Sequence, residues 1–475
     1  MDRVLVRNGR LGFEDRVEAG DVLLVDGRVA AVGAGLEAPP EAAVVDAAGC
    51  FVLPGFIDLH THLDDRIGRF ELGDTYLTGT AAAVQNGVTT LFSFVTQGPE
   101  ETLGEAIDRV LGRAAGRCFC DVGWHLTPTR FDAAGWREVE TACRNGWRTF
   151  KFYTTYKEAG IYISYARLGD LFVRLTPAGA CFLVHCEDED RLAAERDAGH
   201  DCRHAISHAR LRPPRAERLA VERVLELADP WASPVHVVHV STAAAARRIR
   251  AARARQPVTG ETCPHYLFLD ESWLRRPDGH RWICSPPLRR REQAAALCRA
   301  VREGCLDLLA TDHCAFKCND KDNNYSDTRF TPNGLAGIGA LPHLAARFWS
   351  HAGTGLKTGS APGPSPAEDV EARPGLTESA VPDLVRTLSA NPARVAGVYP
   401  RKGALAAGSD ADLVVLDPRG SARPITSSLA GVPETYPGFS SRLRFRAVFL
   451  RGRRVVRDGV LENPDSPGGE SLCPR

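Results

Sequence analysis

The segment Pro54-Gly-Phe-Ile-Asp-Leu-His-Thr-His62 is a short apolar stretch that ends in two histidines, His60 and His62. Residues two apart in a β-strand point to the same face, so both imidazoles project together from the end of the predicted strand. Two imidazoles in this position are half of a metal site. Since a single His-x-His pair also occurs by chance, the rest of the chain decides whether the site exists and which fold carries it.

The composition is that of an ordinary globular protein without charge bias. The 475 residues include 59 Lys and Arg and 59 Asp and Glu, so the net charge gives no reason to expect nucleic acid or an anionic membrane as a partner. The sequence has no run of about 18 uncharged apolar residues that would predict a transmembrane span, and no signal peptide is visible after Met1. We therefore expect a cytoplasmic protein whose 14 scattered cysteines are reduced.

The middle of the chain alternates apolar strands with helical stretches. The predicted strands are residues 56–60, 89–95, 120–126, 149–153, 181–186, 235–240, 257–262 and 307–312. The helical stretches between them include residues 74–86, 100–115, 164–176, 214–229, 241–254 and 292–303. Eight β units in alternation favour an α/β fold, a (β/α)8 barrel of the TIM type, over a doubly wound sheet. We expect this catalytic barrel to span residues 54–402.

Both ends of the chain are rich in short strands and tight turns. Asn-Gly and Asp-Gly pairs separate apolar runs near the N-terminus, which is a strong signal for hairpins. We therefore predict a small β-sandwich domain formed by both termini, from residues 1–53 together with 403–462. A Gly- and Pro-rich insert at about 353–377 is expected to be flexible, and residues 463–475 to form a disordered tail.

Ionisable residues stand at the C-terminal ends of five predicted strands, the face where barrel enzymes carry their active sites. They are His60, His62, Lys151, His185, His239 and Asp312. Each alone has an ordinary explanation, such as a hydrogen-bonded core histidine or an aspartate that caps a helix. Chance does not explain their joint position at one rim, and imidazole and carboxylate ligands suit Zn²⁺.

This set is too large for one tetrahedral zinc and too small for two, unless one ligand is shared. An ammonium has no lone pair, but addition of CO2 would convert Lys151 into a carbamate, N6-carboxylysine, with two ligand oxygens. The first metal would then be bound by His60, His62, Asp312 and the carbamate, and the second by His185, His239 and the same carbamate. We therefore predict two Zn²⁺ bridged by carboxylated Lys151.

Several longer motifs resemble a known family. They are Pro54 to Asp64, Phe150-Lys-Phe-Tyr-Thr-Thr-Tyr156, Gly260-Glu-Thr-Cys-Pro-His-Tyr-Leu267, Ser285-Pro-Pro-Leu-Arg289, Ala310-Thr-Asp-His-Cys314, Thr331-Pro-Asn-Gly-Leu335 and Lys402 to Leu413. Over roughly residues 3–460 the chain resembles the cyclic amidohydrolases, specifically the dihydropyrimidinase/hydantoinase group of the amidohydrolase superfamily. The resemblance implies a hydrolase with a two-zinc site, bridged here by Lys151, in a homo-oligomer that is a tetramer or a dimer.

The resemblance also implies the reaction and the residues that perform it. A dihydropyrimidine or hydantoin ring would be hydrolysed to an N-carbamoyl amino acid by a bridging hydroxide, which exists at neutral pH because metal ions lower the pKa of bound water. Asp312 would carry the proton to the leaving nitrogen, and Tyr156 would stabilise the oxyanion. Ser285 and Asn333 would bind the imide edge of the ring, although a turn-forming role also accounts for these two.

Three related readings are alternatives: a dihydroorotase, an allantoinase and a non-catalytic dihydropyrimidinase-like scaffold. Dihydroorotases carry an arginine soon after the second histidine, where this chain has Leu63 and Asp64. The hypothesis of a non-catalytic scaffold conflicts with the presence of a ligand residue at all six metal-binding positions. The following loop is more charged than in hydantoinases, so it is either a solvated face or a place where Arg66 or Arg69 favours an acidic ring substituent.

Overall fold

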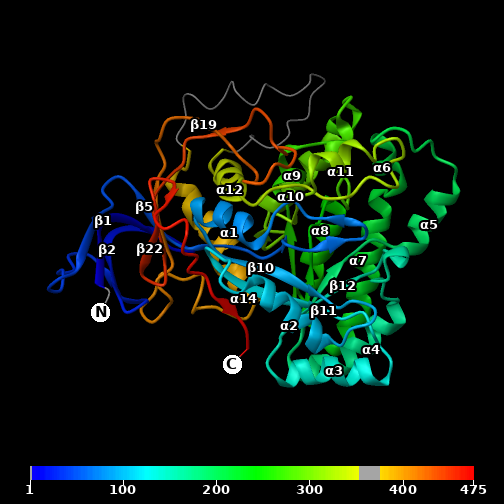
Figure 1. The fold of residues 1–475 in the computed structure, drawn as a ribbon, viewed down its shortest axis with the longest axis horizontal. Helices are drawn as coiled ribbons and strands as arrows, with labels where there is room; N and C mark the ends of the chain where they lie inside the picture. The colour runs from blue at the N-terminus through cyan, green and yellow to red at the C-terminus, as the bar shows by residue number, and fades with distance from the viewer. Residues whose placement is uncertain (1–2, 352–374, 475) are drawn as a thin grey trace.

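The computed structural model describes residues 3–351 and 375–474, and its centre is a barrel of eight parallel strands surrounded by helices (Figure 1). The strands are β6 (Phe56–Asp58), β10 (Val88–Thr96), β11 (Asp121–Thr127), β12 (Thr149–Tyr153), β13 (Cys181–His185), β14 (Val235–Val237), β15 (Val258–Thr262) and β16 (Leu308–Leu309). Each is hydrogen-bonded to the next in this order. All eight predicted barrel strands are therefore confirmed.

The barrel closes at its C-terminal rim. Directly after β6 and β16 the chain forms β7 (Thr61–His62) and β17 (His313–Cys314), which pair in parallel. The buried Asp58 carboxylate reinforces this seam, because it accepts hydrogen bonds from the Thr311 backbone N–H at 3.0 Å and from the Thr311 hydroxyl at 2.6 Å. The first and last strands, which carry predicted metal ligands, are thus joined beside those ligands.

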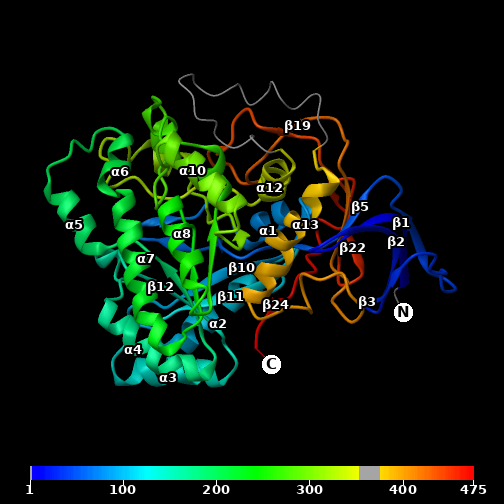
Figure 2. The ribbon, with the colours of Figure 1, turned by 180° about the vertical axis from the view of Figure 1, so that it is seen from behind.

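Helices cover the outside of the barrel (Figure 2). The longer ones are α1 (Tyr76–Gln85), α2 (Leu103–Ala114), α3 (Ala133–Arg144), α4 (Tyr165–Leu175), α7 (Pro214–Ala228), α8 (Ala243–Ala252), α10 (Arg291–Arg302) and α12 (Leu341–Ser350). The shorter ones are α5 (Glu189–Asp197), α6 (Ile206–Leu211), α9 (Pro264–Phe268), α11 (Cys318–Asp322), α13 (Val381–Val385) and α14 (Asn391–Val395). Local sequence sets their ends: in α2, Thr102 and Glu105 form a reciprocal capping box. Within the described part of the chain, no helix has the length and apolar character needed to cross a membrane.

Both ends of the chain build a second sheet, as predicted. Its strands are β1 (Arg3–Gly12), β2 (Val17–Val25), β3 (Arg28–Gly33), β4 (Ala43–Asp46), β5 (Phe51–Pro54), β18 (Leu413–Asp417), β21 (Arg444–Leu450), β22 (Arg453–Arg457) and β23 (Val460–Leu461). Strand β5 pairs with β1 on one side and with β18 on the other, so it joins the N-terminal and C-terminal parts. The sheet lies at one end of the barrel (Figure 1). The domain boundaries at residues 53 and 403 stay a prediction.

A buried charge cluster fastens this sheet to the barrel. The Lys402 ammonium lies 2.5 Å from a carboxylate oxygen of Asp121 on β11, 2.6 Å from Asp412 and 3.0 Å from Asp410. Arg451 also pairs with Asp121. The three carboxylates lie close enough together to hold a metal ion, but here the lysine ammonium compensates their charge.

Replacing Lys402 with methionine is expected to destabilise the fold by about 3–5 kcal/mol, because three buried carboxylates would lose their main counter-charge. Urea unfolding followed by circular dichroism measures the change. The control is Lys157→Met, since the Lys157 side chain is half exposed and pairs with Asp190 only at 3.8 Å. Equal stability of both variants would contradict this account of the cluster.

The C-terminal tail differs from the expectation of disorder. Residues Ser471–Leu472 form β24, which pairs in parallel with Val122 and Gly123 of β11. The edge of β11 at Val122 and Gly123 is available to the tail because β11 pairs with β12 only near its C-terminal end, where Leu126 pairs with Phe150. For the residues up to 474, the prediction of a disordered tail was therefore wrong, because the unpaired edge of β11 binds the tail.

The predicted insert falls largely outside the described residues, which resume at residue 375. Of its last residues, Leu376 is buried, and the Thr377 N–H donates to the Ser350 hydroxyl at the end of α12.

Candidate active site

The structure brings the predicted ligands together at the C-terminal rim of the barrel. One carboxylate oxygen of Asp312 lies 3.2 Å from His60 Nε2 and 3.4 Å from His62 Nε2. The ligand atoms of these three residues lie within 4.8 Å of one another, which is close enough for one metal ion. Lys151 Nζ lies 3.5 Å from His60 Nε2. Residues from strands one, four and eight therefore meet at one point.

The second pair of histidines adjoins the first. The ring centroids of His185 and His239 are 4.5 Å apart, and those of His60 and His239 are 5.4 Å apart. Lys151 lies near enough for its charge to lower the pKa of both His185 and His239, although burial is the larger cause for each. Lys151 thus contacts His60 and shares the electrostatic surroundings of His185 and His239.

Lys151 is fully buried in a largely aromatic surrounding. Its ammonium lies 4.9 Å from the ring centroid of Tyr153 and 5.3 Å from that of Phe94. Burial lowers the pKa of Lys151 to about 8, and the charges of Asp312 and Glu261 oppose this shift only in part. Near pH 8, Lys151 is therefore a neutral amine in a substantial fraction of the protein molecules, and the neutral amine is the form that can add CO2.

The donor set suits metal ions. Burial lowers the pKa of His60 to about 4 and that of His239 well below its usual range, so both imidazoles are neutral and keep a lone pair for a metal. Among the residues that the structure describes, none is a hydrogen-bond partner of the buried Nδ1 of His239. A buried polar atom without a partner is costly, and metal coordination is one way to satisfy it. The residues present therefore fit zinc.

Two glutamates that were not predicted orient these histidines. Glu261 Oε1 lies 2.6 Å from His60 Nδ1, and Glu187 Oε2 lies 2.8 Å from His185 Nε2. A carboxylate on the far nitrogen of a metal-binding histidine fixes the ring and raises its basicity. The sequence signals are weak: Glu187 stands two residues after His185, and Glu261 lies inside a motif recognised only as a family likeness.

Three site residues have a left-handed backbone, which is unusual for residues other than glycine. The φ angles are 71° at Tyr156, 38° at His239 and 48° at Asp312. Backbone strain of this kind persists where surrounding contacts hold it, and it concentrates at functional sites. At Tyr156 the backbone N–H donates to Glu189 at 3.1 Å, and the Arg212 guanidinium lies 4.9 Å from the centre of the ring.

The predicted substrate-binding residues Ser285 and Asn333 lie on adjoining segments. The Gly334 N–H, next to Asn333, donates to the carbonyl of Ile283 at 3.0 Å, and Ile283 lies two residues before Ser285. The Ser285 hydroxyl lies 3.1 Å from Nε2 of His208. The side-chain oxygen of Asn333 is buried and has no hydrogen-bond partner within residues 3–351 and 375–474, so it can accept a bond from a ligand.

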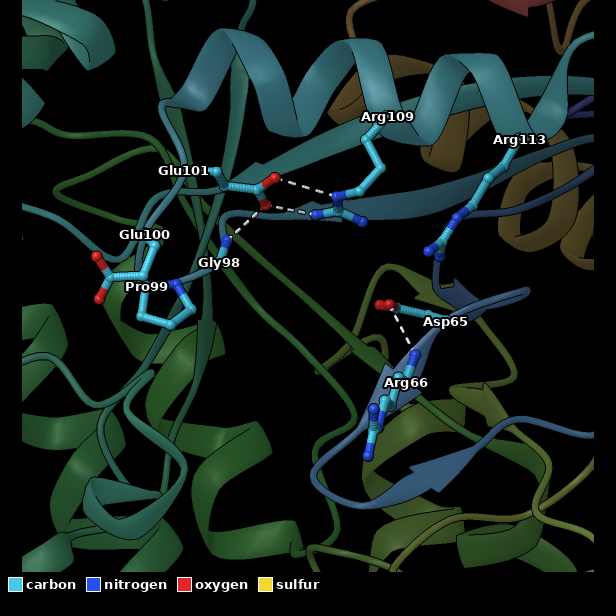
Figure 3. Close-up of a pocket in the computed structure, with 8 residues that line it drawn as sticks. All are labelled: Asp65, Arg66, Gly98, Pro99, Glu100, Glu101, Arg109 and Arg113. Atoms are coloured by element: carbon cyan, nitrogen blue, oxygen red, sulfur yellow. Dashed lines mark hydrogen bonds and ion pairs between the residues drawn. The ribbon is translucent and has the colours of Figure 1, made fainter.

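Arg66 and Arg69 occupy different surroundings. They lie on the hairpin of β8 (Arg66–Ile67) and β9 (Phe70–Glu71). Arg69 donates to Asn324, on the segment that leads to Asn333. Arg66 lines a pocket of about 430 Å³ between this hairpin and α2 (Figure 3), and the remaining lining residues are Asp65, Gly98, Pro99, Glu100, Glu101, Arg109 and Arg113. Three acidic and three basic side chains line the pocket, so its charge does not single out an acidic ligand. The selection of an acidic substituent stays a hypothesis.

Comparison with known proteins places this chain in a family. The model of the amidohydrolase family matches residues 51–455, which include every predicted metal ligand. The chain belongs to the amidohydrolase family. Within it, a D-hydantoinase of Ralstonia pickettii is 30% identical over 98% of this chain and 97% of its own length. A D-hydantoinase of Streptomyces coelicolor is 32% identical over 96% and 95%.

Solved structures of amidohydrolases agree with this assignment. The dihydropyrimidinase of Brevibacillus agri superposes with a TM-score of 0.88 at 30% identity, covering 99% of this chain and 98% of its own. A D-hydantoinase structure superposes with a TM-score of 0.87 at 30% identity, covering 100% and 99%. The predicted membership in the dihydropyrimidinase/hydantoinase group is confirmed, and so is the prediction of an enzyme of the cyclic amidohydrolase class.

Proposed function

We propose that the protein hydrolyses the cyclic amide bond of a hydantoin or dihydropyrimidine to give an N-carbamoyl amino acid. The names of its relatives support this class of substrate. The observation that carries the proposal is the meeting of His60, His62 and Asp312 with buried Lys151 at one rim. No observation favours dihydroorotase or allantoinase activity, and the complete ligand set argues against a scaffold.

The proposed cofactors are two Zn²⁺ ions. One would be held by His60, His62 and Asp312, the other by His185 and His239, with carboxylated Lys151 shared between them. When bound, two such ions lower the pKa of water and polarise the carbonyl under attack.

The residues of the chain perform the other steps. Burial raises the pKa of Asp312, but its contacts with the imidazoles of His60 and His62 and the nearby Lys151 together lower it to about 2, so it is ionised and can accept a proton. Asp312 would then deliver this proton to the leaving ring nitrogen. Burial raises the pKa of Tyr156 to about 12, so its phenol stays protonated and can donate a hydrogen bond to the developing oxyanion.

Orientation of the ring falls to Ser285 and Asn333. The unpartnered side-chain oxygen of Asn333 can accept from a ring N–H, and the backbone groups of both residues can pair with the imide edge. A ring held in this way presents one carbonyl to the metal side of the site, and a fixed orientation of this kind lowers the entropic part of the barrier.

Metal removal is expected to abolish ring opening. Protein dialysed against a chelator should lose activity by at least about a thousandfold, which corresponds to several kcal/mol of transition-state stabilisation, and Zn²⁺ with bicarbonate should restore it. Ring opening is followed spectroscopically on dihydrouracil, phenylhydantoin, a carboxyalkyl hydantoin, allantoin and dihydroorotate. Full activity without metal, or activity on none of the hydantoins and dihydropyrimidines, would contradict the proposal.

A further inference from the structure

Lys321 is a buried lysine that the reaction described above does not use. It lies on α11, in the segment after the last barrel strand, and its side chain is 1% exposed. Among the described residues the hydrogen bonds give its ammonium one acceptor, the backbone carbonyl of Ile283, at 2.9 Å. An ammonium has three donors and is rarely buried without a carboxylate, so this arrangement is costly. Such a cost suggests that the contact with Ile283 has a function.

The Ile283 carbonyl joins the two segments proposed to bind substrate. It accepts from Lys321 Nζ and also from the backbone N–H of Gly334 at 3.0 Å. Ser285 follows Ile283 by two residues, and Asn333 directly precedes Gly334. A shift of this one carbonyl would therefore change the separation of the two residues that face the imide edge of the ring.

The neighbouring residue, Asp322, holds the same region from the solvent side. Its carboxylate accepts from His280 Nε2 at 2.8 Å and from Arg281 at 2.9 and 2.7 Å, just before Ile283 in the chain. Two consecutive residues of α11 thus fix residues 280–283. Asp322 binds side chains of this segment, and Lys321 binds its backbone.

The segment that contains Asn333 is also packed closely against Cys314, which leaves its backbone little room to move. A Cβ on Gly334 would lie 2.3 Å from the carbonyl oxygen of Cys314, so only glycine permits this close approach. The cavity that Lys321 itself lines has a volume of about 10 Å³, room for about one water molecule. This cavity has no room for a ring beside Lys321, and the contact that its ammonium makes is with the Ile283 carbonyl.

We propose that Lys321 is a positioning residue for substrate binding, which keeps Ser285 and Asn333 at the spacing that fits the imide edge of a cyclic ureide. This inference rests on the proposed function. Among the described residues, the hydrogen bonds of Lys321 do not include a proposed metal ligand. Loss of the contact should therefore weaken binding of the ground state and transition state alike, and so raise KM with little effect on kcat.

The test compares Lys321→Met with Lys317→Met, a lysine of the same segment that is more than half exposed. For the best hydantoin or dihydropyrimidine, KM is expected to rise about tenfold or more in Lys321→Met, the scale of one hydrogen bond to a charged group, with kcat almost unchanged. The control should match wild type. A fall in kcat with unchanged KM, or unchanged constants, would overturn the proposal.

A second variant keeps the test decisive if Lys321→Met does not fold. Asp322→Asn removes charge from a side chain that is 32% exposed, so the fold should tolerate it, and a smaller rise in KM is expected. An unchanged KM in this variant would then overturn the proposal. A wild-type enzyme that opens no hydantoin or dihydropyrimidine contradicts the proposed function, whereas an active wild type with unchanged KM in the variants overturns only the role of Lys321.

Discussion

Lys151→Met is expected to lower kcat/KM by at least about a thousandfold and to reduce bound zinc, since methionine cannot form the carbamate that two metals would share. The structure supports this strong effect because Lys151 is fully buried and its ammonium lies 3.5 Å from His60 Nε2. Zinc per subunit is measured by elemental analysis on protein made with bicarbonate. Native mass spectrometry of the wild type should show the added CO2.

The matched control for this change is Lys157→Met, a half-exposed lysine six residues along the chain. It should keep wild-type activity and zinc content. Lys151→Arg tests the chemistry further, because it preserves positive charge but cannot carry the carbamate, and it should be as inactive as Lys151→Met. Wild-type activity and full zinc content in either Lys151 variant would show that Lys151 is not a ligand shared by two metals.

Asp312→Asn is expected to lower kcat by about 10²–10⁴, the range for loss of a general acid–base group. The amide keeps the size of the side chain and one oxygen. Asp312 has a pKa of about 2, so it is ionised and can accept a proton, whereas the amide cannot. KM should change much less than kcat, because the imide contacts proposed for Ser285 and Asn333 are not altered. Steady-state kinetics with zinc-loaded enzyme measures both constants.

Two further measurements separate the roles of Asp312. If it is both ligand and proton carrier, zinc content should fall in Asp312→Asn, whereas a pure proton carrier would leave it unchanged. Asp108→Asn on the exposed face of α2 is the control and should behave as wild type. A kcat within a few-fold of wild type in Asp312→Asn would exclude Asp312 as the proton carrier.

Local patterns in the sequence predicted the fold well. The eight apolar segments matched the eight barrel strands, because parallel strands buried on both faces read as continuous apolar runs. The meeting of the candidate ligands at one rim was predictable for a related reason: in a barrel, residues at the C-terminal ends of strands converge whatever the loops do. The disordered tail was predicted wrongly, since its polar, Gly- and Pro-containing sequence carries no sign of the open edge on β11 that binds it.

The sequence by itself determined that His60, His62, Lys151, His185, His239 and Asp312 stand at strand ends, and that the first histidine pair could be more than chance. Only the tertiary structure decided how they are held. His60 meets Glu261, 201 residues away, and Lys321 meets the carbonyl of Ile283, 38 residues away. Periodicity and turn residues report interactions within a few positions of the chain, whereas these contacts depend on which strands and loops close the barrel next to one another.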